Sequence, residues 1–519
     1  MIEQKTIDSI IKLDKRVKSA TSQIHNSAVV CTVYDPALGA VFGELELTVP
    51  DLLLIAAITE VHMLLTGPTG CAKTDIAELV CGGLFGNEGF KTLRLNTGLS
   101  EDTISDTDTR KLFKGECTVN ESIRPEDYLT LPGIVLDEVN RAPSVLANLL
   151  LGLNEKKIHI KCGIKNAEVG YKFRSPDGQE CRYHFVIATM NEGKEYSGIF
   201  PMDPAFRRRF PIEIPLGDLR PTPHDDLRID EQRNGAVEPI NYDSLIEDIT
   251  RLTSNITELP LDHFAKIYLL YLKNVGRCPN SPSGFHPEDN SHQLCIRSEC
   301  RAQKVDNSFC SSVGGLSKAG SISLKRVSCG MALLRIARTV EAIEQACREG
   351  DADTIEKLRH FADSSASGNK LRRAVLKKYL TISTVQVGDI KAMFPFIALG
   401  GKVWMSPEYV AKNFLGFRFS AMQNYAQLTY SKLKSFFAQN RALFEQLPSG
   451  NGTVEKLKKR LEHAERTSDP FIRPTIEAYL DKYHSKPRNG DQIAEEITAI
   501  VPVRDSAREL LCGKLGMIL

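Results

Sequence analysis

The sequence predicts an α/β protein in which a parallel sheet comes first and a largely helical region follows. Between about residues 45 and 216, short apolar runs alternate with amphipathic stretches of helix length, which is typical of a parallel sheet with helices on both faces. After residue 226 the strand signal fades and helical periodicity takes over. A chain of 519 residues is too long for one core, so we expect three or four units.

Four apolar runs are predicted to be buried strands, because each is short, rich in branched residues and followed by polar ones. They are "HMLLTG", "TLRLN", "GIVLDE" and "HFVIATMN", which begin at His62, Thr92, Gly133 and His184. The carboxyl ends of parallel strands meet at one edge of a sheet, where ligands bind in this architecture. We therefore expect the polar residues at these four strand ends to converge.

The first of these strands leads into a phosphate-binding loop, "GPTGCAKT". Its backbone amides can form an anion-binding nest at the start of a helix, with Lys73 reaching the β- and γ-phosphates and the Thr74 hydroxyl ligating Mg²⁺. The general pattern has glycine where this chain has Ala72, and one methyl group is tolerated if that residue has helical φ and ψ. The predicted nucleotide-binding residues are Gly67, Pro68, Thr69, Gly70, Cys71, Ala72, Lys73 and Thr74.

Two further strand ends carry residues suited to nucleotide hydrolysis. In "GIVLDEVNRA" the adjacent carboxylates have separate roles: Asp137 holds Mg²⁺ and its water shell, and Glu138 polarises the attacking water. In "HFVIATMN" the amide of Asn191 can bond both the γ-phosphate and that water. The turn "DPAFRRRF" follows, and one of its three arginines can stabilise transition-state charge across a subunit boundary, while at least one of them is a solvated basic residue.

In this order the motifs resemble those of the AAA+ ATPases, and most closely those of the MoxR branch. The MoxR pattern has alanine before the lysine, as in "GCAKT", and it has counterparts of "DEVNRAP", "ATMN", "PAFRRRF" and the lead-in His62. Three positions depart from it: Thr69 and Glu192 replace prolines, and Arg208 replaces an aspartate. The resemblance makes Arg209 the best arginine-finger candidate, with Arg208 next to it.

The resemblance also implies how the rest of the chain is organised. It implies an extra hairpin before the Asn191 strand, with its turn at Asp177-Gly178, and a helical lid in which Lys325 or Arg326 is a weak candidate for contacting the nucleotide. The expected divisions are an N-terminal extension (1–44), an AAA+ core (45–220), a lid (221–404) with a Cys-rich insertion at about 278–310 and a charged helical insertion at about 348–378, and a C-terminal helical domain (405–519).

Four cysteines lie within the Cys-rich insertion, separated by sixteen, four and nine residues. Thiolates at loop spacing can build a structural zinc site, and this polar segment contains few apolar residues to hold one shape. The spacing is not that of a standard zinc finger, so plain thiols and a redox pair are alternatives. The candidate ligands are Cys278, Cys295, Cys300 and Cys310.

Composition and charge narrow the function classes only broadly. Lys and Arg number 66 against 65 Asp and Glu, which favours no particular partner, and 42% hydrophobic residues are ordinary for a soluble protein. The apolar run from Leu52 contains Glu60 and is shorter than the roughly 20 residues of a membrane span, so we expect a cytoplasmic protein without membrane insertion. Thirteen cysteines without an export signal fit reduced thiols better than a disulfide framework.

Three hypotheses follow for the function. The resemblance implies an ATPase that uses ATP and Mg²⁺, assembles into a homo-oligomeric, often hexameric ring, and remodels a protein client with a von Willebrand factor A domain partner. The second is a nucleic-acid motor or loader, favoured by eight basic against two acidic residues in Cys295 to Arg338 and disfavoured by the neutral overall charge. The third is a scaffold that binds nucleotide and hardly turns it over.

Overall fold

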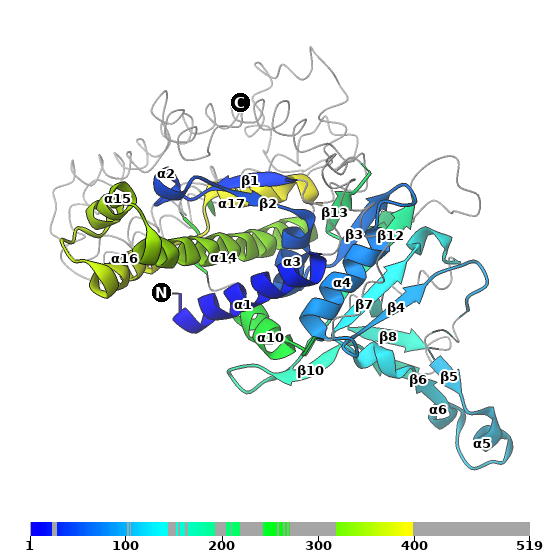
Figure 1. Ribbon diagram of the computed structural model, residues 1–519. Coiled ribbons are helices and arrows are strands. Elements are labelled where there is room, and N and C mark those ends of the chain that lie inside the picture. Colours follow the sequence, from blue (N-terminus) through cyan, green and yellow to red (C-terminus); the bar gives the residue numbers. More distant parts are fainter. Residues whose placement is uncertain are drawn as a thin grey trace, which may run out of the picture. The chain divides into compact units, whose positions relative to one another are not determined.

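The computed structural model describes the sheet and much of the helical region (Figure 1). The described residues are 2–22, 29–100, 103, 105–143, 152–153, 156–160, 165–191, 204–207, 209–217, 242–256, 259–262, 265–266, 269 and 318–397. The chain divides into two compact units. The first comprises Met1–Leu259, Ile322–Thr384 and Ala392–Trp404, and the second comprises Pro260–Ser321, Val385–Lys391 and Met405–Leu519.

A five-stranded parallel sheet forms the centre of the first unit, with the strand order β13-β3-β12-β7-β4. The strands are β3 (Met63–Gly67), β4 (Phe90–Arg94), β7 (Gly133–Asp137), β12 (Phe185–Asn191) and β13 (Ile212–Pro215). Every residue of β3 and β12 is buried, which explains why both read as continuous apolar runs. The α/β fold expected from the sequence is confirmed, and β13 is a fifth strand that was not predicted.

The two faces of the sheet are covered differently. Helix α4 (Lys73–Phe85) follows the phosphate loop and packs on one face with Ile76, Val80 and Leu84 buried. The opposite face carries a hydrophobic cluster that includes Leu136, Ala188 and residues of the hairpins described next. Both faces are therefore covered, as a parallel sheet requires.

Besides the pair of β1 (Cys31–Tyr34) with β2 (Glu44–Leu47), the described part of the first unit contains three further antiparallel strand pairs. The pair β10 (Tyr171–Arg174) and β11 (Glu180–Tyr183) turns at Gly178, whose φ is +83°, so the hairpin predicted there is confirmed. The other two pairs are β5 (Ser105–Thr107) with β6 (Ile123–Pro125), and β8 (Lys157–Ile160) with β9 (Lys165–Glu168). The β5–β6 pair carries α5 (Thr109–Phe113) and α6 (Val119–Ser122) away from the sheet (Figure 1).

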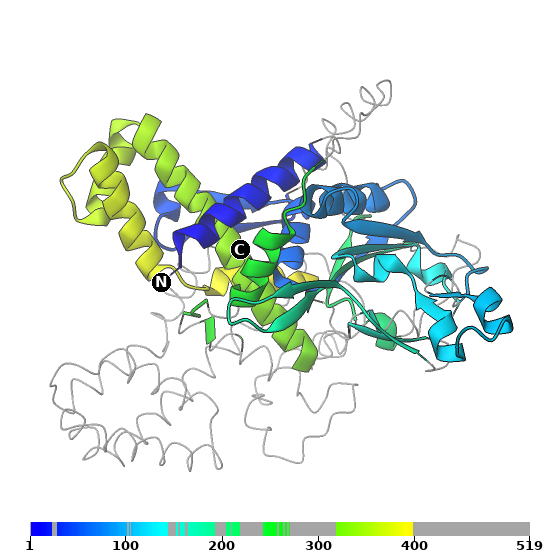
Figure 2. The same cartoon turned by 90° about the horizontal axis from the view of Figure 1, so that it is seen from below.

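The N-terminal segment packs against α4 and the helices around it rather than standing apart. Helix α1 (Gln4–Thr21) packs against α3 (Val49–Thr59), α4 and α10 (Ile246–Asn255), as Figure 2 shows from below. Helix α3 is buried at every position, because it lies among the other helices. The remaining elements are α2 (Gly39–Phe42), η2 (Asp127–Thr130), α14 (Lys318–Glu349), α15 (Ala352–Ala362), α16 (Gly368–Ile382), α17 (Val387–Met393) and η7 (Phe394–Phe396).

A buried ion-pair network joins α14 to the N-terminal segment. Arg338 donates through Nε and an Nη to the two carboxylate oxygens of Asp14, at 2.9 and 2.7 Å, and also pairs with Asp51. Burial alone would raise the pKa of Asp14, but hydrogen bonding and charge from Arg338, with a contribution from Lys18, leave that pKa below its ordinary value. The expected lid helix and N-terminal extension are thus tied together within one unit.

A second buried ion pair also links α14 to the N-terminal segment. Arg335 pairs with Asp35 at 2.5 Å, and the hydroxyl of Tyr379 on α16 donates to the same carboxylate at 2.6 Å. Most of the expected charged insertion (about 348–378) lies in the two helices α15 and α16, and α16 is anchored through Tyr379. In the described residues, no helix is both long enough and apolar enough to cross a membrane.

Replacing Arg338 with alanine should destabilise the protein by about 3–5 kcal/mol, because two buried carboxylates would lose their counter-charge. Urea unfolding of the full chain, followed by circular dichroism, measures the effect. Arg348→Ala is the control, since that arginine is exposed on the same helix and should cost less than about 0.5 kcal/mol. A loss below about 1 kcal/mol for Arg338→Ala would show that the network does not hold α14 in place.

Candidate nucleotide site

The phosphate loop links β3 to α4 and is built closely against a neighbouring segment. Gly67 has φ +145°, and a Cβ there would lie 2.7 Å from the backbone nitrogen of Gly217, so only glycine fits. Gly70 follows with φ +87°. The loop therefore takes a turn that exposes successive backbone amides at the start of α4, as an anion site needs.

Lys73 is buried inside this loop. Its ammonium donates to the carbonyl oxygens of Gly67 and Pro68, at 3.0 and 2.6 Å, and lies 3.6 Å from the sulfur of Cys71. No acidic side chain of the described residues forms an ion pair with it. A buried ammonium held by neutral groups is charge-compensated only when an anion binds, so the residues present fit a phosphate.

Ala72 adopts the left-handed conformation, with φ 55° and ψ 29°. The methyl group was expected to be tolerated if this residue had helical φ and ψ, and a right-handed helical conformation is not what Ala72 adopts. The nest requires a left-handed residue just before α4, which glycine would adopt without cost and alanine adopts at roughly 1–2 kcal/mol. The loop keeps the left-handed turn at this residue, and the backbone of Ala72 is strained because alanine disfavours that conformation.

Asp137, at the carboxyl end of β7, joins the loop to the neighbouring strand. Its Oδ1 accepts hydrogen bonds from the hydroxyl of Thr74, at 2.5 Å, and from that of Thr189 on β12, at 2.7 Å. The Thr189 hydroxyl also accepts from the backbone nitrogen of Glu138, at 2.9 Å. The two residues predicted to hold Mg²⁺ are thus in direct contact, and Thr189 fixes the strand end that carries them.

Glu138 follows directly and is also left-handed, with φ 56° and ψ 49°. Asn191 donates its amide to Oε1 of Glu138 at 2.7 Å, and Nε of Arg141 lies 3.1 Å from Oε2. Strained backbone conformations of this kind persist where the surrounding structure fixes them, commonly at functional sites. The structure therefore brings the predicted water-polarising residue and the predicted γ-phosphate-sensing residue together.

Asn140 holds these two strand ends in register. Its side-chain amide donates to the backbone carbonyl of Asn191 at 2.9 Å, and both residues are buried. The sequence predicted no role for Asn140, Arg141 or Thr189. Their positions in "DEVNRA" and "ATMN", directly beside the acidic pair and Asn191, were the available signal.

The arginine turn is described in part. Arg207, at the end of α8 (Pro204–Arg207), forms a two-point ion pair with the buried Glu213 on β13, so this arginine supports the fold and is not the solvated basic residue expected among the three. Arg209 follows α8 and is partly exposed. Arg208 lies outside the described residues, and so do Cys278, Cys295, Cys300, Cys310 and the expected C-terminal domain.

Arg326 lies near the amino-terminal end of β3, whereas the loop lies at the carboxyl-terminal end of that strand. Its guanidinium is 4.0 Å from Glu60, which precedes β3, whereas the loop follows β3. At about 3.3 Å per residue the five-residue strand separates the two by more than 10 Å, so Arg326 does not contact the loop of its own chain.

His62 has a structural role. Its Nδ1 accepts a hydrogen bond from the backbone nitrogen of Val186 at 3.1 Å, and burial, followed by the neighbouring His184, lowers the pKa of His62.

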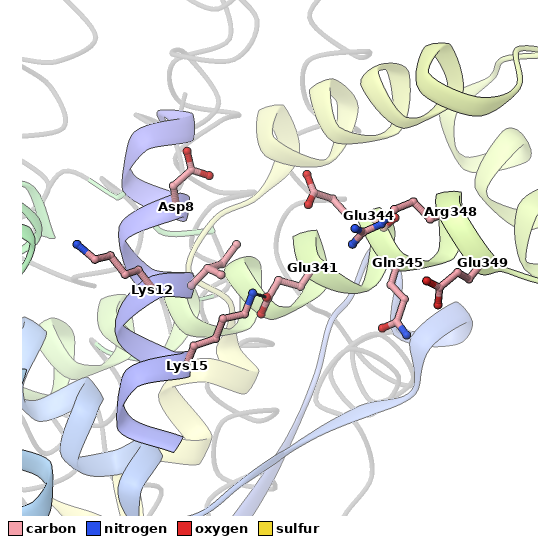
Figure 3. Close-up of a pocket in the computed structure, with 9 residues that line it drawn as sticks. Asp8, Lys12, Lys15, Glu341, Glu344, Gln345, Arg348 and Glu349 are labelled. Atoms are coloured by element: carbon pink, nitrogen blue, oxygen red, sulfur yellow. Dashed lines mark hydrogen bonds and ion pairs between the residues drawn. The ribbon is translucent and has the colours of Figure 1, made fainter. Parts of the chain in front are cut away.

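A separate pocket of about 620 Å³ lies between α1 and α14 (Figure 3). Lys15 on α1 and Glu341 on α14 pair across it at 2.7 Å. Its lining includes three basic and four acidic side chains, so it has no strong charge preference. None of its lining residues belongs to the loop or to the strand ends described above. They are Asp8, Ile11, Lys12, Lys15, Glu341, Glu344, Gln345, Arg348 and Glu349.

Comparisons with known proteins agree with this geometry. The family described as AAA domain (dynein-related subfamily) matches residues 62–210, the stretch that carries the loop, both carboxylates and Asn191. The match identifies this part of the chain as similar to AAA domains. Its sheet with helices and the helical region that follows are the AAA+ fold, so the predicted fold class is confirmed.

Two solved structures are similar to parts of the chain. A candidate ATPase from Cytophaga hutchinsonii has 15% sequence identity and a TM-score of 0.42, covering 72% of this chain and 96% of that one. A full-length MCM homolog from Methanopyrus kandleri has 12% identity and a TM-score of 0.32, covering 72% of this chain and 62% of that one. Comparison with curated proteins gave no match.

Replacing Ala72 with glycine should stabilise the protein by about 1 kcal/mol, because it removes the left-handed strain at that residue. Urea unfolding measures the change. Ala77→Gly, within the right-handed interior of α4, is the matched control and should destabilise by about 1 kcal/mol or more. Destabilisation by Ala72→Gly of the same size as the control would contradict the left-handed assignment.

Proposed function

We propose that this chain is an ATPase that uses ATP and Mg²⁺ through its AAA domain. The observation that carries the proposal is the contact between Thr74 and Asp137, which places the end of the phosphate loop 2.5 Å from the acidic strand end. Hydroxyl and carboxylate oxygens are the ligands that Mg²⁺ prefers, so this pair fits the metal. When bound, the metal would neutralise charge on the phosphates.

The protein's own residues divide the remaining work. The loop amides and Lys73 would bind the β- and γ-phosphates, and Asn191 would position the γ-phosphate and the attacking water. Glu138 would accept a proton from that water, since its carboxylate is partly exposed at the strand end. The site is closed on the strand side by Asn140 and Thr189, which hold Glu138 and Asn191 in fixed positions.

The first test is the ATPase rate of Glu138→Gln. Replacing a general base typically costs 10²–10⁴-fold, so we expect a fall in kcat of about 10²-fold or more, with ATP binding retained. Lys73→Ala should instead lose binding, measured by titration with a fluorescent ATP analogue. Glu116→Gln is the control, because that carboxylate lies exposed in a surface pair with Lys114. Turnover by Glu138→Gln equal to that of the wild type would exclude Glu138 as the base. If the wild-type protein binds ATP but does not hydrolyse it, the result would favour a nucleotide-gated scaffold.

We further propose a MoxR-type role, in which subunits form a ring, commonly a hexamer, and remodel a protein client together with a von Willebrand factor A domain partner. The support is the sequence resemblance in the loop, "DEVNRAP" and the arginine turn. Arg209, with Arg208 beside it, would reach the nucleotide of a neighbouring subunit. Arg207 is unsuited to this role because it pairs with Glu213.

Mixing two inactive variants tests the shared site. Arg209→Ala and Lys73→Ala should each abolish turnover alone, but a mixed assembly contains interfaces with an intact loop on one side and an intact arginine on the other. We expect the mixture to recover part of the wild-type ATPase rate, measured after co-expression and purification through two different tags. No recovery in a mixture shown to co-assemble would argue against an arginine supplied by the neighbour.

A further inference from the structure

Arg141 lies beside Glu138 and has no role in the mechanism set out above. It ends the short helix η3 (Val139–Arg141), three residues after Glu138, and the two side chains are 35% and 31% exposed. Within the described part of the chain, Glu138 is the only acidic side chain in ion-pair range of Arg141. Each charge therefore depends on the other for compensation at the edge of the site.

The two oxygens of the Glu138 carboxylate are held from two directions. Asn191 on β12 donates to Oε1, and Arg141 lies against Oε2. An ionised carboxylate offers about four lone-pair sites, so these two contacts leave room for a water to approach. A glutamate side chain at a partly exposed strand end would otherwise sample several rotamers, which would misplace it for proton transfer.

We propose that Arg141 is a positioning residue that, together with Asn191, clamps the Glu138 carboxylate in its working orientation. This inference rests on the proposed function, because it assumes that Glu138 acts on the attacking water. The clamp acts by charge rather than by a directed hydrogen bond, since Nε of Arg141 is buried and makes no hydrogen bond with the described residues although Oε2 is 3.1 Å away. A lysine at this position should therefore restore part of the effect.

The clamp predicts a split between turnover and nucleotide affinity. Arg141 makes no contact with the loop residues among the interactions of the described chain, so Arg141→Gln should lower kcat by about 10- to 100-fold and leave KM for ATP within about twofold. Arg141→Lys should recover at least part of that loss. Arg124→Gln is the matched control, because Arg124 is an exposed arginine whose partner, Asp108, lies 3.5 Å away on the β5–β6 hairpin.

The decisive measurement combines the Arg141 and Glu138 substitutions. If Arg141 acts through Glu138, adding Arg141→Gln to Glu138→Gln should cause no further loss of kcat. Thermal unfolding of each variant checks the fold, and Arg141→Met supplies a second neutral replacement. A multiplicative loss in the double variant, an unchanged or raised kcat in Arg141→Gln, or a change confined to KM would each overturn the clamp.

The same experiment separates this inference from the proposed function. If Glu138→Gln hydrolyses ATP as fast as the wild type, the assignment of Glu138 as the base is contradicted, and so is the proposed role of Arg141. A strong loss in Glu138→Gln accompanied by wild-type turnover in Arg141→Gln contradicts the clamp alone.

Discussion

The candidate nucleotide site depends on the hydrogen bonds accepted by one carboxylate oxygen, Oδ1 of Asp137. It receives the hydroxyl of Thr74 from the start of α4 and that of Thr189 from β12, so three segments distant in the sequence meet at one atom. The parallel register of β7 with β12 and of β12 with β3 brings their carboxyl ends to one edge. With the donors fixed in this way, Glu138 and Asn191 have little freedom in where they lie.

Two residues of this arrangement have a strained backbone. Ala72 and Glu138 are both left-handed, although neither is glycine, and they directly precede α4 and η3, the helices that carry Lys73 and Arg141. Such conformations cost of order 1–3 kcal/mol each and persist only when buried structure around them leaves no alternative. Here that structure is the fully buried β3 and β12, together with the close approach of Gly217 to Gly67.

Strands β3, β7 and β12 and the convergence of their polar ends were predictable from the sequence, because burial on both faces produces uninterrupted apolar runs that end in polar residues. The expectation of a fourth buried strand in "TLRLN" was wrong, because β4 lies at the edge of the sheet and only Leu93 of this strand is buried. The conformation of Ala72 was not predictable, since a residue type does not report its φ, and the family pattern shows only that alanine is accepted there. The ion pairs of Arg338 with Asp14 and Asp51 could not be predicted from the sequence either, because the partners lie roughly 300 positions apart and no local pattern pairs them. Arg141 was overlooked for a different reason: its neighbours Asp137 and Glu138 account for the expected chemistry without it.

The central claim is that the loop, Asp137, Glu138 and Asn191 form a single ATP site, and a crystal structure of the Glu138→Gln protein with ATP and Mg²⁺ tests it most directly. The account predicts the triphosphate within the loop, with Lys73 at the β- and γ-phosphates and the metal about 2.1 Å from the Thr74 hydroxyl, beside Asp137. Nucleotide bound elsewhere, or a metal that contacts neither Thr74 nor Asp137 directly or through water, would contradict it.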